Sequence, residues 1–339
     1  MKIILDAFGG DNAPLEIVKG GWRAAKENSE IELILCGDEK KINDVLKKEN
    51  LEKLSNVSIH HASEVILGTD DPVSAIRQKK DSSMVVGLNL LKSGQGDAFV
   101  SAGNSGALLS GATLIVKRLK GIKRAAMAPV LPTATGPAIL IDGGANVVCK
   151  SEYYEQFGLM GSIYMKKVMG IEDPKVGLLN IGTEECKGTE TVMEAYQLLK
   201  KAPLHFYGNL EVRDVLKGDC QVLVGDGWTG NIVLKLVEGV AKEFSGELKA
   251  MFKKNILTML AAFMVGKQLK AFKKRFDYKE YGGAPIMGLN APVIKAHGSS
   301  DAKAIYYAIQ QAYNCVRQDV VGSIASALPD EKIEKQEKK

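Results

Sequence analysis

Residues 2–14 read Lys2-Ile-Ile-Leu-Asp-Ala-Phe-Gly-Gly-Asp-Asn-Ala-Pro14, a short apolar run that opens into a polar glycine turn. Similar apolar runs predict buried parallel strands at 3–5, 31–35, 57–59, 98–100, 139–141, 176–179 and 222–224. Helical patterns lie between them, for example over 14–26 and 72–91, and Asp71 before Pro72 is a helix start signal. The alternation predicts an α/β fold, a three-layer α/β/α sandwich with a mostly parallel sheet.

Further helices are predicted to begin near Thr189, near Gly230 and near Ser300, which could cap a helix that starts at Asp301. The chain has 339 residues, of which 45% are hydrophobic and 25% charged, so it can bury a large core. No linker rich in Pro, Gly or Ser divides it. We therefore expect a single catalytic α/β domain over 1–328 and a charged, disordered tail over 329–339.

The five cysteines show no CxxC spacing, which predicts reduced thiols in the cytosol, no metal site and no cofactor bound through them. Residues 1–20 lack the apolar region of a signal peptide. The longest central apolar stretch, 256–265, is shorter than the roughly 20 residues that a helix needs to cross a bilayer. We expect a cytoplasmic protein with no transmembrane span and no nucleic-acid partner.

Five predicted strands end in polar turns, at residues 6–11, 101–106, 142–146, 180–188 and 225–231. Ligands of open α/β sheets bind at the carboxyl ends of the strands, and glycine there lets backbone N–H groups approach an anion closely. We expect the turns to share one rim and to bind phosphate. The predicted phosphate or substrate contacts are Asp6, Gly9, Gly10, Asp11, Ser101, Gly103, Ser105, Gly106, Asn146, Asn180, Gly182, Asp226, Gly227 and Gly230.

Three familiar signatures nearly match these turns. Residues 225–230 satisfy GxGxxG, but the acidic residue that would hold a ribose about 20 positions later is replaced by a lysine-rich stretch. Residues 103–107 resemble a serine nucleophile elbow, yet Ala107 stands where glycine is required. Residues 182–188 lack the Gly-Lys-Ser/Thr order of a nucleotide triphosphatase. A free phosphate site remains the favoured interpretation.

Two residues stand out as candidates for chemistry. Lys187 lies inside a glycine turn rather than on a helix face, and we predict that it contacts phosphate. His297 precedes Gly298 and Ser299 at another predicted helix start, so it could orient phosphate or accept its last proton.

The positive charge is concentrated in an amphipathic helical segment over 246–276. The apolar residues recur at helical spacing, with Gly266 between two helices. Eight basic residues lie here with no acidic one between Leu248 and Phe276, and removing these eight from the net +5 leaves −3. The predicted contacts are Lys253, Lys254, Leu260, Phe263, Lys267, Lys270, Lys273 and Lys274. Three partners remain open, namely an anionic membrane surface, acyl carrier protein, and a second copy in a packed dimer.

Taken together, the motifs resemble the phosphate acyltransferase (PlsX) family over roughly residues 1–325. The resemblance is carried by Asp6-Ala-Phe-Gly-Gly-Asp-Asn-Ala-Pro14, Ser101-Ala-Gly-Asn-Ser-Gly106, Leu178-Leu-Asn-Ile-Gly-Thr-Glu-Glu185 with Lys187-Gly188, Asp226-Gly-Trp-Thr-Gly-Asn-Ile-Val-Leu-Lys235, and residues 281–300. Phe8, Gly143 and Trp228 depart from the usual Met, Val and Phe, but no polar group is lost.

The resemblance implies a homodimer with a fold related to isocitrate or isopropylmalate dehydrogenase and to phosphotransacetylase. It implies transfer of a fatty acyl group from acyl-acyl carrier protein to inorganic phosphate, in phospholipid synthesis. It also implies peripheral attachment to the membrane and delivery of acyl phosphate to a membrane acyltransferase.

Such a reaction depends on positioning, because a thiolate with a pKa near 8.5 leaves a thioester without strong acid help. Asn104, Asn180 and Asn231 are candidates to stabilise the oxyanion. The rival interpretations are a coenzyme A-dependent phosphotransacylase and a non-catalytic membrane scaffold.

Overall fold

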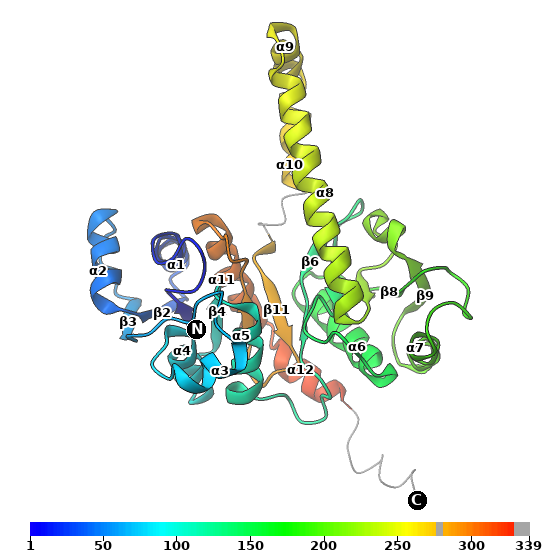
Figure 1. Ribbon diagram of the computed structural model, residues 1–339, viewed down its shortest axis with the longest axis horizontal. Helices are drawn as coiled ribbons and strands as arrows, with labels where there is room; N and C mark the ends of the chain where they lie inside the picture. Colours follow the sequence, from blue (N-terminus) through cyan, green and yellow to red (C-terminus); the bar gives the residue numbers. More distant parts are fainter. Residues whose placement is uncertain (276–280, 329–339) are drawn as a thin grey trace, which may run out of the picture.

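The computed structural model describes residues 1–275 and 281–328, with the side chains of 271–275 excepted. The predicted tail over 329–339, residue 276, and the side chains of Lys273 and Lys274 lie outside the described residues. The strands form two sheets, where the sequence predicted one (Figure 1).

The larger sheet has seven strands, in the order β3 (Val57–His61), β2 (Glu32–Gly37), β1 (Lys2–Asp6), β4 (Ala98–Ser101), β12 (Val293–Lys295), β11 (Ala284–Met287) and β5 (Ala126–Met127). The smaller sheet has five, in the order β6 (Val130–Pro132), β7 (Pro137–Ile141), β10 (Val222–Val224), β8 (Val176–Asn180) and β9 (Phe206–Glu211). Most pairs are parallel, so the α/β fold class is confirmed.

The chain leaves the larger sheet at β5 and enters the smaller one at β6, with Pro129 between them. Proline donates no backbone hydrogen bond, so a continuous central strand is unfavourable at this point. The chain returns to the larger sheet at β11 and β12. One cluster of buried side chains nevertheless includes residues of both sheets, such as Ile3 and Ile139. This shared core supports the expectation of a single domain over 1–328, which stays a prediction.

The helices that pack around the sheets begin and end as follows: α1 (Leu15–Glu27), α2 (Glu39–Lys48), α3 (Pro72–Gln78), α4 (Ser83–Lys92), α5 (Ser105–Gly111), α6 (Ser151–Lys167), α7 (Glu190–Lys201), α11 (Ala302–Arg317) and α12 (Val320–Ala327). A π-helical turn, Ala112–Val116, and a 3-10 turn, Val212–Lys217, complete them.

The predicted helix over 72–91 is in fact two helices, α3 and α4. Asp71 caps α3 as predicted, but Ser82 accepts a hydrogen bond from Val85 N and starts a second helix. The predicted cap of α11 is also wrong, because Asp301 rather than Ser300 accepts from Ala304 N. In both places a side chain that caps the backbone decides where the helix begins.

A helical hairpin projects away from both sheets (Figure 1). It consists of α8 (Gly227–Lys253), α9 (Ile256–Met264) and α10 (Gly266–Arg275). Helix α8 is roughly 40 Å long at 1.5 Å per residue, so only its first turns pack on the smaller sheet. The predicted protruding helical segment is confirmed. Over 246–275 it contains three helices rather than the predicted two, because α8 ends at Lys253 and Asn255 caps α9.

Candidate active site

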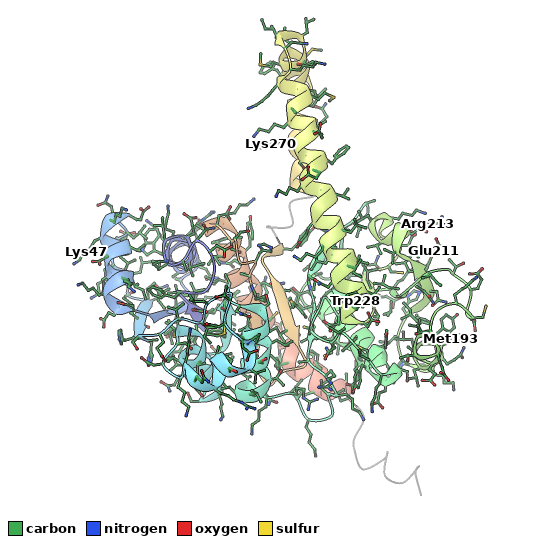
Figure 2. All side chains as sticks on the ribbon, viewed as in Figure 1. Lys47, Met193, Glu211, Arg213, Trp228 and Lys270 are labelled. Atoms are coloured by element: carbon green, nitrogen blue, oxygen red, sulfur yellow. The ribbon has the colours of Figure 1, made fainter. Side chains whose placement is uncertain are left out.

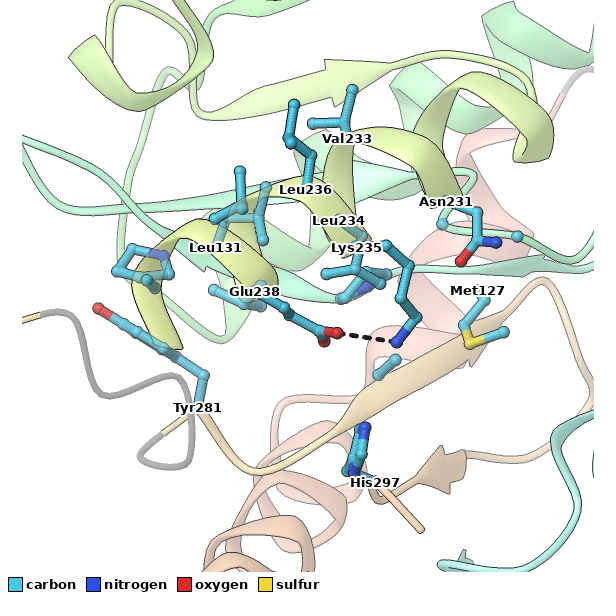
Figure 3. Close-up of a pocket in the computed structure, with 18 of the residues that line it drawn as sticks. Met127, Leu131, Asn231, Val233, Leu234, Lys235, Leu236, Glu238, Tyr281 and His297 are labelled. Carbon is cyan, nitrogen blue, oxygen red and sulfur yellow. Dashed lines mark hydrogen bonds and ion pairs between the residues drawn. The ribbon is translucent and has the colours of Figure 1, made fainter. Parts of the chain in front are cut away.

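A cavity of about 730 Å³ lies between the two sheets and the first half of α8 (Figure 3). It is bordered by residues that follow β4, β7, β10 and β12, so the carboxyl ends of strands from both sheets reach it. We expected the polar turns to share a rim at the end of one sheet. In the structure, turns from both sheets form the rim of the cavity.

Most of the cavity wall is apolar. Aliphatic and aromatic side chains come from β6, from the turn after β9 and from one side of α8; they include Leu131, Val215, Val233, Leu234, Val237, Val240 and Phe244. Such a wall favours an elongated hydrocarbon group over a nucleotide, because burying polar groups against it without partners is unfavourable.

The other end of the cavity is polar and carries positive charge. Helix α8 contributes Asn231, Lys235 and Glu238, and Lys235 Nζ forms an ion pair with Glu238 at 2.8 Å (Figure 3). Ser105, Lys295, His297 and Ser300 line the cavity from the larger sheet. The cavity thus joins a long apolar wall to a cluster of hydrogen-bond donors.

His297 points toward the Lys235–Glu238 pair (Figure 3). Its Nδ1 accepts a hydrogen bond from Ser299 N at 3.2 Å and lies 2.9 Å from Ser299 Oγ. A backbone N–H can only donate, so the proton of the neutral ring is on Nε2. Desolvation lowers the pKa of His297, an effect that Glu238 opposes and Lys235 reinforces. The ring is a hydrogen-bond donor through Nε2 at neutral pH, which favours orientation of phosphate over proton abstraction.

Asp6 lies buried beneath this end of the cavity and joins two turns. Its carboxylate accepts hydrogen bonds from Ser83 Oγ at 2.6 Å and from Ser101 Oγ at 2.7 Å. Ser101 Oγ in turn accepts from Gly103 N at 3.0 Å. Burial raises the pKa of Asp6, and the hydrogen bonds from Ser83 and Ser101 oppose that rise. Asp6 therefore positions the turn after β4 rather than meeting a substrate.

Glycine at position 9 lets these turns approach each other. A Cβ there would lie 2.5 Å from Asp6 Oδ2 and 2.7 Å from Gly103 N. The turn after β1 also contacts the segment that follows β12, because Asp11 N donates to Gly298 O at 2.8 Å. Gly9, Gly10 and Asp11 thus support the cavity rim without lining it.

The turn after β7 is built on a second buried carboxylate, Asp142. It accepts hydrogen bonds from the backbone N–H groups of Met127, Gly144, Ala145 and Asn146 at 2.6–3.1 Å. Burial raises the pKa of Asp142, and these hydrogen bonds oppose the rise. Gly144 then places its backbone against Asn231. The network fixes the smaller sheet's side of the cavity.

Two comparisons bear on the sequence as a whole. The family model described as "Fatty acid synthesis protein" matches residues 1–323. A protein of Alkaliphilus oremlandii with the name phosphate acyltransferase is 50% identical over 337 residues, which cover 98% of this chain and 100% of that protein. The chain belongs to the phosphate acyltransferase family. It is an acyltransferase, and the resemblance drawn from the motifs is confirmed.

Solved structures of lower sequence identity share the fold. The EutD phosphotransacetylase from Staphylococcus aureus aligns with a TM-score of 0.59 at 19% identity, covering 97% of this chain and 94% of that chain. A 4-hydroxythreonine-4-phosphate dehydrogenase from Klebsiella pneumoniae aligns with a TM-score of 0.52 at 13% identity, covering 93% and 98%. The expected relation to phosphotransacetylase and dehydrogenase folds is confirmed.

The structure of this phosphate acyltransferase family member brings some predicted residues together and separates others. Ser105, Asn231 and His297 line the cavity. Asn104 instead caps α5 and donates to the carbonyl oxygens of residues 67, 68 and 70. Asp226 caps α8 and Asn146 is bound to Asp142, so hydrogen bonds within the fold account for both side chains.

Lys187 lies apart from the cavity wall. It is exposed in the loop after β8, where Asn180 donates to its carbonyl oxygen at 3.0 Å. A Cβ added at Gly182 would lie 3.1 Å from Lys187 Cγ. The phosphate contacts assigned to Lys187, Asn180 and Gly182 stay predictions, and the cavity gives them no support.

Sequence reasoning missed Lys295, Lys235, Glu238 and Ser300 as residues of the cavity. One signal for Lys295 was available, because it is a charged residue inside the apolar run Val293-Ile-Lys-Ala296. The i, i+4 spacing of Asn231 and Lys235 also places both on one face of a helix. Neither signal identifies which residues of the other sheet lie across the cavity from Lys295 and Lys235.

Within the described residues, no three His, Cys, Asp or Glu side chains are grouped as a metal site would require. None of the helices over 1–275 and 281–328 combines the length and the apolar character that a membrane span needs.

Proposed function

We propose that this chain transfers a fatty acyl group from acyl-acyl carrier protein to inorganic phosphate, producing acyl phosphate for phospholipid synthesis. The observation that carries the proposal is the cavity, which joins a long apolar wall to a polar, positively charged end. The apolar wall suits the acyl chain, and the polar end suits phosphate and the reacting thioester.

In the proposed reaction a phosphate oxygen attacks the thioester carbonyl, the carbon–sulfur bond breaks, and the thiolate takes the proton that hydrogen phosphate loses. His297 donates through Nε2 to orient phosphate. Asn231, on the first turns of α8, donates its side-chain amide to the oxygen of the tetrahedral intermediate. The apolar wall excludes water, which would otherwise compete with phosphate for the acyl group.

The proposal is tested by mixing the protein with acyl-acyl carrier protein and phosphate and trapping acyl phosphate as a hydroxamate. Product that requires phosphate supports it, and product formation without phosphate dependence contradicts it. Acyl-coenzyme A in place of acyl-acyl carrier protein tests the rival phosphotransacylase. Equal turnover of both donors would favour that rival, and no turnover of either would favour the scaffold.

The helical hairpin supports peripheral attachment of this cytoplasmic enzyme to an anionic membrane. Helix α9 carries no charged residue, and Leu260 and Phe263 are 57% and 87% exposed. Lys253, Lys267 and Lys270 are exposed on the flanking helices, and Lys254 is exposed between α8 and α9. Lys270 lies well away from the sheets (Figure 2). An apolar tip beside lysines matches a bilayer, which offers an apolar interior beneath anionic headgroups. Acyl phosphate made there would pass to a membrane acyltransferase.

Replacing Leu260 and Phe263 together by Glu is expected to reduce binding to anionic vesicles about tenfold or more, because apolar burial is lost and like charge is introduced. Sedimentation with phosphatidylglycerol-containing vesicles measures it. Leu114→Glu, at an exposed apolar residue on the body of the protein, is the matched control and should bind as the parent does. Unchanged binding of the double variant would exclude the tip as the docking surface.

An exposed apolar stripe on α8 supports the homodimer that the family resemblance implies. Ile232, Leu236, Val240 and Phe244 recur at i, i+4 spacing on α8 and are exposed. A stripe of this kind matches the packing face of a second copy. Leu236, Val240 and Phe244 also border the cavity, so a second copy seated on the stripe would help to close it to water.

A further inference from the structure

Lys295, the last residue of β12, is a buried cation at the polar end of the cavity. The residue is 7% exposed and lines the cavity wall. Nζ donates to the carbonyl oxygen of Ala102 at 3.4 Å and to the carbonyl oxygen of Ala296. A lysine ammonium has three N–H donors, so one remains for a group in the cavity.

The charge of Lys295 lacks a neutralising partner in the part of the chain that the structure describes, where it forms no ion pair. Burial lowers the pKa of Lys295 to about 8, although Asp6 and Asp11 favour the charged form. Asp6 is already bonded to Ser83 and Ser101. Burying a cation is unfavourable unless a partner offsets the loss of water. An anionic ligand would be that partner.

Ser300 provides a second donor in the same wall. It is 3% exposed, and its Oγ has no hydrogen-bond partner among the described residues. The helix that follows is capped by Asp301, so Ser300 is not used as a cap. Buried hydroxyl groups are almost always hydrogen-bonded in folded proteins. Because Ser300 also lines the cavity, its unused hydroxyl is available as a donor to a ligand there.

We propose that Lys295 Nζ and Ser300 Oγ form the subsite that holds inorganic phosphate in the cavity. This inference rests on the proposed function and assigns the phosphate to residues other than Lys187. Phosphate offers several oxygen acceptors in tetrahedral geometry, so one ion can accept from the ammonium, the hydroxyl and His297 Nε2 together. The acyl chain would then extend from this point along the apolar wall.

The subsite predicts a pH dependence. The groups around Lys295 are Asp6 and Asp11 from the turn after β1, Lys235 and Glu238 from α8, and His297. Within this group of charges, Lys295 loses its own charge as the pH rises through about 8. Phosphate affinity is therefore expected to fall above that pH.

The test compares full-length variants by phosphate KM, acyl-donor KM and direct binding of inorganic phosphate by calorimetry. Lys295→Met is expected to raise the phosphate KM roughly 100-fold and Ser300→Ala roughly tenfold, with the acyl-donor KM within about twofold of the parent. Lys295→Arg, which keeps the charge, should recover part of the affinity. Lys175→Met, at an exposed lysine before β8, is the matched control. Lys187→Ala tests the alternative prediction that Lys187 contacts phosphate. If that prediction is right, this variant has a sharply raised phosphate KM.

A phosphate KM that stays within about twofold in both Lys295→Met and Ser300→Ala would overturn the subsite and leave the proposed function standing. If the parent makes no acyl phosphate, the proposed function is wrong, and calorimetry still decides the subsite. Phosphate binding that disappears in Lys295→Met then supports the subsite, and binding equal to that of the parent overturns it. Ser300→Ala removes only an unpartnered hydroxyl, so a folding defect cannot account for its result.

Discussion

Gly230→Ala is expected to destabilise the protein by about 3 kcal/mol or more, or to prevent folding of the smaller sheet. Gly230 lies in the first turn of α8, where an added Cβ would be 1.9 Å from the carbonyl oxygen of Asp142. That oxygen belongs to backbone and cannot rotate away. Asp142 is itself held by the turn that it organises through Met127 N and Asn146 N.

The same helix offers a matched control, Gly239→Ala. Gly239 is also helical, but no atom lies within 4 Å of the position that its Cβ would occupy. Alanine favours a helix over glycine by about 1 kcal/mol, so this variant should be slightly more stable than the parent. Urea unfolding followed by circular dichroism measures both. Equal stability of the two variants would contradict the packing role assigned to Gly230.

Lys295→Met is expected to raise the free energy of unfolding at pH 7 by roughly 1–3 kcal/mol, even though activity falls. The pKa of Lys295 is about 8 in the folded protein and 10.5 in the unfolded chain. Below pH 8 both states are protonated, and the folded state carries the full penalty of a buried charge. Methionine of similar size removes that penalty, and the loss of the bonds to Ala102 and Ala296 offsets part of the gain.

The size of this effect depends on pH in a defined way. Between about pH 8 and 10.5 the unfolded chain binds more protons than the folded protein, so the stability of the parent rises with pH. The advantage of Lys295→Met should therefore shrink from pH 7 to pH 9.5. Thermal unfolding at the two pH values measures it, with Lys175→Met as the exposed control. If Lys295→Met is less stable than the parent at pH 7, Lys295 stabilises the folded protein. The buried charge would then no longer argue for an anionic ligand.

A residue that reduces stability yet remains buried at a cavity is typical of functional sites, because binding and catalysis need charge where folding does not. The contrast with Asp6 is informative. Both are buried ionisable groups at the ends of strands of the larger sheet, β1 and β12, which lie on either side of β4. Asp6 is bonded by two serine hydroxyls, whereas Lys295 keeps a free donor. The difference in hydrogen bonding assigns Asp6 to the structure of the site and leaves Lys295 able to bind a ligand.

Seven strands were predicted as apolar runs, but β5, β6, β9, β11 and β12 were missed. Runs that are buried on both faces are the easiest to recognise. The runs at 3–5, 139–141 and 222–224 all lie within strands of the structure. Helix ends were predicted less well. Ser82 and Asp301 cap helices because their side chains reach specific backbone N–H groups, and many other serines and aspartates in the chain do not.

By itself the sequence determined the α/β class, the turns that end the strands, the separation of charge into a helical segment and, through its motifs, the family. These properties depend on local order along the chain, which periodicity and spacing record directly. Only the tertiary structure decided which turns meet. It divided the strands between two sheets, left Lys187 outside the cavity and brought Lys295 and Ser300 to the same wall as Asn231 and His297. The reason is that the cavity forms between segments far apart in the sequence, and their meeting depends on strand order and long-range packing.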